Sequence, residues 1–322
     1  MDKPTLSSPG AQGQVRAVLG EIPYEMLGIT DAHNHAWIDP IPGAAPGAPV
    51  LNQYDKIRDE LDLYRLAGGK SLLDCQPGGC GRNANQLARL SRGTGVNIIA
   101  CTGFNRKKYY PADHWLFRTN SGQAAEFFLG ELISALQETQ DQPEPIRAGF
   151  IKVALESGWS DSPQVLLEGA AGVARQTGSL VQIHTEKGGL AEKVAAYFAD
   201  QGIAPDQLVL CHMDKRPDLG LHVELAKFGA LLEYDTFYRP QYEPESNLWA
   251  LIQKMVDAGL RDHIALATDM AVATMYTTIG NGPGLASLPG EIKTKLLKMG
   301  MSESSIQGML GGNIARRLAG PD

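Results

Sequence analysis

The chain contains 322 residues, of which 43% are hydrophobic and 20% are charged, and it carries a formal net charge of −7 at pH 7. This composition excludes a disordered chain and a disulfide-stapled miniprotein. No apolar stretch approaches the roughly 18 residues that cross a bilayer, which excludes a membrane protein. The acidic excess, with no dense basic run, argues against a nucleic-acid partner. The first twenty residues lack the apolar core of a secretion signal, so we expect a cytoplasmic protein.

The four cysteines are too few to hold a chain of this length together through disulfides. Cys75 and Cys80 lie near each other in the sequence, but a CxxxxC spacing alone is weak evidence for a zinc site. We therefore expect Cys75, Cys80, Cys101 and Cys211 to be reduced and to be buried as small apolar side chains.

Short apolar runs rich in β-branched residues recur along the chain, and a helix-like stretch follows each of them. Their nearly continuous hydrophobicity suits strands that are buried on both faces, as parallel sheets require. The predicted strands are Leu27–Thr30, Ser71–Asp74, Asn97–Thr102, Gly149–Val153, Ser179–His184, Gln207–Cys211, Ala230–Tyr234 and His263–Thr268.

Stretches with helical periodicity separate these strands. Gly178 and Gly202 stand where the C-terminal ends of two helices are expected. The alternation of strands and helices predicts an α/β fold, a (β/α)8 TIM barrel rather than a doubly wound sheet. We expect one domain over residues 1–322, with a lead-in at residues 1–26 and extended loops on the C-terminal face, the longest at Gly103–Asn120. The helical spacing is carried by Tyr54, Ile57, Leu61 and Tyr64, by Leu190, Val194 and Tyr197, and by Leu248, Ile252, Met255 and Val256.

Histidine and aspartate residues gather at the C-terminal ends of the predicted strands, where the active sites of barrel enzymes lie. His33 and His35 are two residues apart, so on a strand their imidazoles point the same way. His184 and His212 close the fifth and sixth strands, and Asp269 follows the eighth. Neutral imidazoles and a carboxylate suit a hydrolytic divalent ion such as Zn²⁺. A lone His-x-His pair is weak evidence, and the prediction depends on the whole set.

Lys152 lies in the fourth predicted strand, among these candidate metal ligands, where a buried ammonium would repel a cation. Three interpretations compete for it. The amine could be a neutral Schiff-base lysine, or it could form an ion pair with a carboxylate. It could also be carboxylated by CO₂, which turns the cation into an anion able to bridge two metals. The surrounding metal-ligand residues favour the third.

The order and context of these residues resemble the phosphotriesterase-related branch of the amidohydrolase superfamily, a (β/α)8 barrel with a binuclear metal centre. The likeness covers nearly the whole chain. Its motifs are Gly13–Gly20, the stretch from Asp74 through Gly81-Arg82-Asn83, Thr102-Gly103, Ile151–Ala154 and Gly312–Arg317.

The resemblance implies two divalent ions per subunit, with Zn²⁺ first and Mn, Co or Fe as alternatives. A hydroxide bridging them would attack the substrate, because the metals lower the pKa of bound water. Asp269 would accept the proton of this hydroxide and pass it to the leaving group or to solvent. A small-molecule substrate and a homodimer are further expectations. One metal would be held by His33, His35 and Asp269, the other by His184 and His212, with N6-carboxylated Lys152 bridging them.

The branch includes phosphotriesterases, lactonases and amide hydrolases. Triesterases often place a histidine after the aspartate that follows the seventh strand, but Thr236 follows Asp235 here, which disfavours phosphotriester hydrolysis. The loops resemble those of sugar-lactone and phosphosugar-lactone hydrolases, although residues 270–276 contain no cation to bind a phosphate. The sequence favours a lactonase, with a phosphotriesterase or amide hydrolase on the same metals as alternatives. The candidate substrate contacts are Lys107, Lys108, Tyr109, Lys215, Arg216, Tyr238 and Arg239.

Two hypotheses from other classes are a Schiff-base aldolase that uses Lys152 and a binding protein on an inactive barrel. The intact set of metal-ligand residues argues against the second. Among the other histidines, we expect structural roles for His222 and His263, while His114 in the long loop is a candidate substrate contact.

Overall fold

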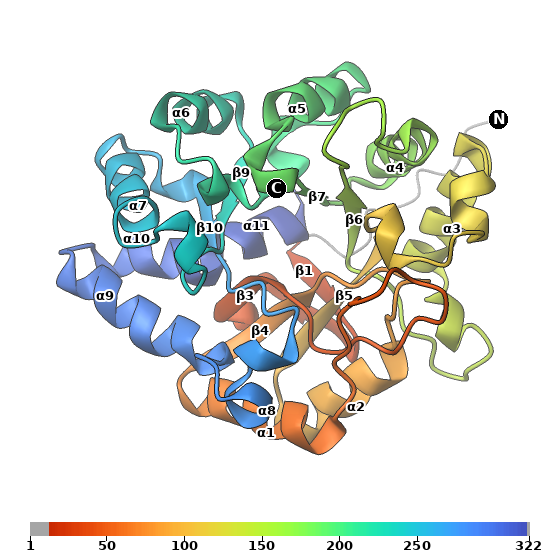
Figure 1. Ribbon diagram of the computed structural model, residues 1–322, viewed down its shortest axis with the longest axis horizontal. Coiled ribbons are helices and arrows are strands. Elements are labelled where there is room, and N and C mark those ends of the chain that lie inside the picture. The colour runs from red at the N-terminus through yellow and green to blue at the C-terminus, as the bar shows by residue number, and fades with distance from the viewer. Residues whose placement is uncertain (1–12, 321–322) are drawn as a thin grey trace.

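The computed structural model describes residues 13–320 of the chain. Eight strands lie side by side in chain order, and every neighbouring pair within this sheet is parallel. A ring of helices surrounds them (Figure 1), which confirms the predicted (β/α)8 barrel. The barrel strands are β3 (Ile29–Asn34), β4 (Gly69–Asp74), β5 (Asn97–Gly103), β6 (Phe150–Ala154), β7 (Val181–His184), β8 (Leu208–Cys211), β9 (Leu231–Tyr234) and β10 (Ile264–Leu266).

The helices begin and end where local signals predict. Asn120 caps α3 in a capping box with Gln123, and Gly178 ends α4 in the left-handed conformation. Gly202 lies one residue beyond Gln201, the C-cap of α5. The helices are α1 (Tyr54–Leu66), α2 (Ala84–Thr94), α3 (Ser121–Ile133), α4 (Gln164–Thr177), α5 (Ala191–Asp200), α6 (Leu219–Phe228), α7 (Leu248–Asp257), α8 (Thr277–Gly280), α9 (Lys293–Lys298), α10 (Glu303–Gln307) and α11 (Asn313–Ala319).

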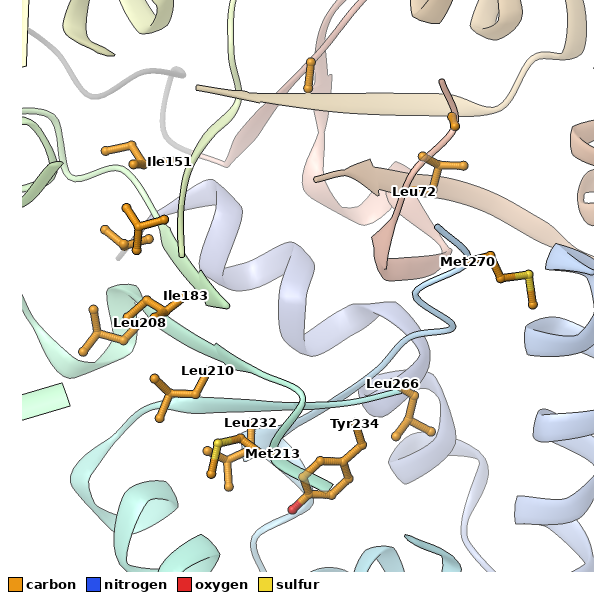
Figure 2. Close-up of a cluster of buried hydrophobic side chains, with 14 of the residues drawn as sticks. Leu72, Ile151, Ile183, Leu208, Leu210, Met213, Leu232, Tyr234, Leu266 and Met270 are labelled. Carbon is orange, nitrogen blue, oxygen red and sulfur yellow. The ribbon is translucent and has the colours of Figure 1, made fainter. Parts of the chain in front are cut away.

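The strand side chains alternate between two hydrophobic clusters. On β5, Ile98 and Ala100 pack outward in the same cluster as helix residues such as Leu61, while Ile99 and Cys101 belong to a second cluster in the barrel interior. Figure 2 shows the outward set, which includes Leu210, Leu232 and Leu266. Burial on both faces explains why the strands appear in the sequence as nearly continuous apolar runs. The four cysteines are buried and free, as expected.

The buried carboxylate of Asp31 accepts hydrogen bonds that join the first strand of the barrel to the segment after the last strand. Thr268 donates from its backbone nitrogen to Asp31 Oδ1 at 3.1 Å and from its hydroxyl to Oδ2 at 2.5 Å. Asn34 Nδ2 donates to the same Oδ2 at 2.8 Å. The backbone nitrogen of Asp269 also donates to the carbonyl of His33 at 3.0 Å. These hydrogen bonds between residues 31–34 and 268–269 form the seam of the barrel. The seam brings His33 and Asp269, which are far apart in the chain, to the same point of the barrel mouth.

The predicted bounds of the first and last barrel strands were wrong. The first strand, predicted at Leu27–Thr30, runs instead from Ile29 to Asn34, so that His33 lies within it. It extends because the pairing with β4 continues through polar residues that face the barrel mouth. The last strand, predicted at His263–Thr268, is only Ile264–Leu266. It ends early because the backbone nitrogen of Thr268 donates to the side chain of Asp31 and not to the backbone of a neighbouring strand.

Residues 1–12 of the predicted lead-in lie outside the described residues. The rest of it contains an antiparallel hairpin that the sequence analysis did not predict, formed by β1 (Gln14–Ala17) and β2 (Gly20–Pro23). The predicted long loop lies between β5 and α3 and includes two short 3-10 turns, Lys107–Tyr109 and Trp115–Arg118. Across residues 13–320, no helix combines the length and the apolar character needed to traverse a bilayer.

Candidate metal centre

The predicted ligands from β3 and β6 and the aspartate after β10 meet at the C-terminal end of the barrel. His33 Nε2 lies 3.7 Å and His35 Nε2 lies 3.6 Å from the same oxygen, Asp269 Oδ1. Lys152 Nζ lies 3.4 Å from His33 Nε2. These residues are buried or nearly so, and their polar atoms converge on one point although they come from three separate parts of the chain.

Of the two remaining predicted ligands, His184 ends β7 and His212 directly follows β8. His212 Nε2 is 2.8 Å from His184 Nδ1. The imidazole rings of His33 and His212 have their centroids 4.9 Å apart, so the two groups of residues adjoin. The structure therefore brings all six predicted metal-ligand residues into a single cluster.

Three of the four clustered histidines have a hydrogen-bond partner on the ring nitrogen that faces away from the cluster. Such a partner fixes the ring orientation and the tautomer, which leaves the other nitrogen free to bind a metal. For His184 the orientation is reversed, because its Nδ1 faces the cluster and its Nε2 lies 3.7 Å from Glu186 Oε2. The other partners are Glu233 Oε2 for His33 Nδ1 at 2.7 Å, Gln76 Oε1 for His35 Nδ1 at 2.8 Å, and Asp235 Oδ2 for His212 Nδ1.

Two of the clustered residues have left-handed backbone conformations, which non-glycine residues seldom adopt. The φ angle is 63° at His212 and 44° at Asp269. Such conformations cost about 1–3 kcal/mol and are found mainly at functional sites. His212 directly follows β8, and Asp269 directly follows Thr268, which bonds to Asp31. At both positions the turn of the backbone directs the side chain into the barrel mouth.

Lys152 is buried, with 1% of its surface exposed. Its Nζ lies 3.3 Å from Cys211 Sγ and 3.4 Å from His33 Nε2, and among residues 13–320 it forms no ion pair with a carboxylate. The ion-pair interpretation of this lysine is therefore not supported. A buried ammonium without an anion is strongly unfavourable, and an N-carboxylated side chain at this position would remove the problem.

This donor set fits divalent metal ions. Ligand atoms of His33, His35 and Asp269 all lie within 4.8 Å of one another. Imidazole nitrogens with a carboxylate suit Zn²⁺ and its neighbours in the transition series. A second close group, His33, His212, Glu233 and Asp235, consists of the histidine–carboxylate hydrogen bonds just described, so we interpret it as support for the ligands.

The carboxylate of Asp269 is shared between the cluster and an arginine. Arg239 Nη2 donates to Asp269 Oδ2 at 2.6 Å and to the backbone carbonyl of the same residue at 2.6 Å. Burial would raise the pKa of Asp269, but the charge of Arg239 and the nearby His33 outweigh it and hold this pKa well below its ordinary value. Asp269 is therefore ionised at neutral pH.

A cavity of about 390 Å³ opens above the cluster. Four of the predicted substrate contacts line it, namely Lys108, Tyr109, Lys215 and Arg239. The other three do not line it. The backbone nitrogen of Lys107 donates to Glu156, Arg216 forms an ion pair with Glu192 at 3.0 Å, and the Tyr238 hydroxyl donates to Glu291 at 3.2 Å.

The remaining histidines lie away from this cavity. His114 packs against Tyr110, with ring centroids 4.9 Å apart, and it does not line the cavity. His222 bonds through Nδ1 to the Tyr234 hydroxyl at 2.7 Å, and His263 Nδ1 donates to the carbonyl of Ala230 at 3.1 Å. These contacts agree with structural roles for His222 and His263.

Sequence reasoning missed several residues that support the cluster, above all Glu233, Gln76 and the pair Arg106–Glu186. Glu233 had a detectable signal. It lies in a predicted strand, two residues after Leu231, which belongs to the interior cluster. Because side chains two residues apart on a strand point to the same face, the carboxylate of Glu233 faces the barrel interior. The others lie in loops, where no periodicity indicates the direction of a side chain.

A parallel barrel with imidazole and carboxylate donors at its C-terminal mouth is the arrangement of a barrel hydrolase. The family model of the phosphotriesterase family matches residues 13–318, and the chain therefore belongs to this family. Membership confirms the resemblance on which the expected ligand set was based.

Two relatives of the chain bear the names of different hydrolases. A phospho-furanose lactonase of Mycoplasmopsis synoviae (strain 53) is 29% identical, over 94% of this chain and 91% of the relative. An N-acetyltaurine hydrolase of Salmo salar is 26% identical, over 95% of this chain and 98% of the relative.

Solved structures agree with the fold. A lactonase from Listeria monocytogenes superposes with a TM-score of 0.87 at 24% identity, over 96% of this chain and 100% of that chain. An amidohydrolase from Mycoplasma synoviae superposes with a TM-score of 0.85 at 27% identity, over 97% of this chain and 94% of that chain.

Proposed function

We propose that this protein is a metal-dependent lactonase that opens a sugar-type lactone. The observation that carries the proposal is the convergence of six donor residues, with each histidine presenting its metal-binding nitrogen to the cluster. The similarity to a phospho-furanose lactonase, which aligns over nearly the whole chain, supports the choice of lactones.

The cluster would hold two divalent cations, with Zn²⁺ as the first candidate and Mn, Co or Fe as alternatives. When bound, such cations polarise a substrate carbonyl and lower the pKa of a water molecule. N-carboxylation of Lys152 would add a second anionic ligand to the cluster, beside the carboxylate of Asp269. The proposed ligands are His33, His35 and Asp269 for one cation and His184 and His212 for the other, with carboxylated Lys152 between them.

The side chains around the cavity would orient the lactone and move its protons. Asp269 is ionised and lies at the base of the cavity, so it would accept the proton of the attacking water and return it to the leaving alkoxide. Arg239 holds this carboxylate in place. Lys215, whose ammonium is mostly buried beside the cavity, would bind oxygens of the substrate, and Lys108 with Tyr109 would cover the opening.

The position of Thr236 supports lactone over phosphotriester hydrolysis. Its hydroxyl is buried and donates to Asp214 Oδ2 at 2.5 Å, so it is not free to continue a proton relay from Asp235. Amide hydrolysis is the second candidate, because an amide-hydrolase relative aligns over nearly the whole chain. A Schiff-base aldolase is disfavoured, since Lys152 Nζ lies 3.4 Å from the imidazole of His33 within the cluster of candidate metal ligands.

The test is metal analysis of protein purified without chelator, followed by rates on matched lactone, amide and phosphotriester substrates. We expect bound divalent metal, loss of activity on chelation, recovery with Zn²⁺, Mn²⁺ or Co²⁺, and the highest kcat/KM on lactones. A metal-free protein that hydrolyses no lactone after metal addition would overturn the proposal. Borohydride trapping of a carbonyl substrate on Lys152 would favour the aldolase instead.

A further inference from the structure

Arg106 connects three loops at the mouth of the barrel. It lies after β5, and its Nε donates to Glu156 Oε2 after β6 at 3.0 Å. Its Nη1 donates to Glu186 Oε2 after β7. The three side chains are largely buried, with exposed fractions of 16%, 18% and 27%. Two carboxylates therefore neutralise this arginine, which leaves it unavailable for a substrate anion although it lines the cavity.

The same carboxylate oxygen of Glu186 lies beside a histidine of the metal cluster. His184 Nδ1 faces His212, and its Nε2 is 3.7 Å from Glu186 Oε2. This Nε2 is buried and has no hydrogen-bond partner among residues 13–320. His33 and His35 differ in this respect, because each has a direct bond from its outward nitrogen. The orientation of His184 therefore depends on Glu186 more than on any other described carboxylate.

The backbone around Glu186 is held in place independently of the side chain. Glu186 begins a 3-10 turn that contains Lys187 at φ 56° and Gly188 at φ 71°. A Cβ atom on Gly188 would lie 2.8 Å from Arg216 Cβ, so the turn packs closely against the loop after β8. With the backbone held, the direction of the Glu186 side chain is set by its bond to Arg106.

We infer that Glu186 is a positioning residue for His184 and that Arg106 keeps Glu186 in position, so that the loop after β5 controls retention of the metal at His184. This inference rests on the proposed function. A carboxylate near the outward N–H of a ligand histidine orients the ring and raises the basicity of the ligating nitrogen. Arg106 directly precedes the 3-10 turn Lys107–Tyr109, so the same ion pairs also place Lys108 and Tyr109 over the cavity.

Metal retention in matched variants tests this inference. Glu186→Gln removes the charge beside His184, and Arg106→Met leaves that charge but frees the side chain that carries it. Glu156→Gln is the control, because it removes the other ion pair of Arg106 without touching His184. Each full-length variant, loaded with Zn²⁺, is dialysed against graded concentrations of chelator, and the zinc that remains per chain is measured together with the melting temperature of the metal-free protein.

We expect Glu186→Gln to lose one zinc ion at a chelator concentration about tenfold lower than wild type, within the range for partners of metal ligands. Arg106→Met should lose the same ion more readily than wild type, and Arg106→Lys should recover part of the retention. Glu156→Gln should behave as wild type, and the metal-free melting temperatures should agree.

Zinc retention in Glu186→Gln equal to that of wild type would overturn the positioning role alone. Equal losses in Glu156→Gln and Glu186→Gln would also overturn it, because they would indicate a general weakening of the loops. A wild-type chain that binds no zinc would overturn the proposed function, and the inference with it.

Discussion

A single guanidinium nitrogen of Arg239 donates to both the backbone carbonyl and the carboxylate of Asp269, each at 2.6 Å. We call this pair of hydrogen bonds the clamp. Only Oδ1 of the carboxylate then faces His33 and His35. The clamp holds a residue in a left-handed backbone conformation, with φ at 44°, at the point where the barrel closes.

Removal of the clamp should impair turnover more than substrate binding. We expect Arg239→Met to lower kcat for a lactone by roughly 10- to 100-fold, because a small displacement of a catalytic group has effects of this size. Steady-state kinetics on the lactone that the wild type prefers would measure it. Arg216→Met, which breaks only the pair with Glu192, is the matched control and should keep wild-type kcat.

Lys152 provides a test of the lysine carbamate. Lys152→Ala should reduce lactone hydrolysis by at least about 100-fold, since it would remove the ligand between the two cations. Added short-chain carboxylic acids should restore part of the rate, because they can occupy the space and supply the anion. The rate is followed as a function of acid concentration at constant pH. A complete lack of rescue would count against a bridging carbamate.

Glu233 should affect metal binding through His33. Glu233→Ala removes the acceptor for His33 Nδ1, and we expect a decrease of about 10- to 100-fold in metal affinity. Chelator competition gives the affinity, and circular dichroism of the metal-free variant reports on the fold. Glu233→Gln retains an acceptor oxygen and should lie between Glu233→Ala and wild type. Unchanged affinity in both variants would contradict the assigned contact.

A buried ion-pair network that does not line the cavity predicts how stability depends on pH. Arg82 is paired with Glu131 and Glu138, and its guanidinium is buried. Burial would raise the pKa of Glu138, but hydrogen bonding to Arg82 and its charge lower this pKa below the ordinary value of 4.5. The stability that this group contributes is therefore present above pH 4.5 and is lost as the pH falls through the lower, folded-state pKa.

Urea denaturation between pH 7 and pH 3 checks this prediction. The wild-type free energy of unfolding should decrease toward acid, and Glu138→Gln should reduce the slope of that decrease. At pH 7 we expect Glu138→Gln to be about 1–3 kcal/mol less stable, because Arg82 loses one charged partner. A variant whose pH dependence equals that of wild type would show that Glu138 does not contribute to it.

Much of the fold was predictable because the physical signal is local. Parallel strands buried on both faces require continuous apolar runs, and those runs are visible in the sequence without knowledge of their neighbours. The predicted bounds were wrong at β3 and β10, where polar residues form the seam of the barrel. A strand that continues through Asp31 and His33 cannot be recognised by hydrophobicity, since its pairing depends on β4 and on Thr268.

The candidate ligands were also predictable, because each lies in a strand or within three residues of its end, and parallel strands end at the same face of a barrel. Their order along the chain carries the resemblance to the family. The residues that orient those ligands did not follow from that order. Glu233 and His33 are 200 positions apart, Arg106 and Glu186 are 80 apart, and Arg239 and Asp269 are 30 apart. Such contacts depend on which loop lies beside which strand end, and only the closed barrel brings them together.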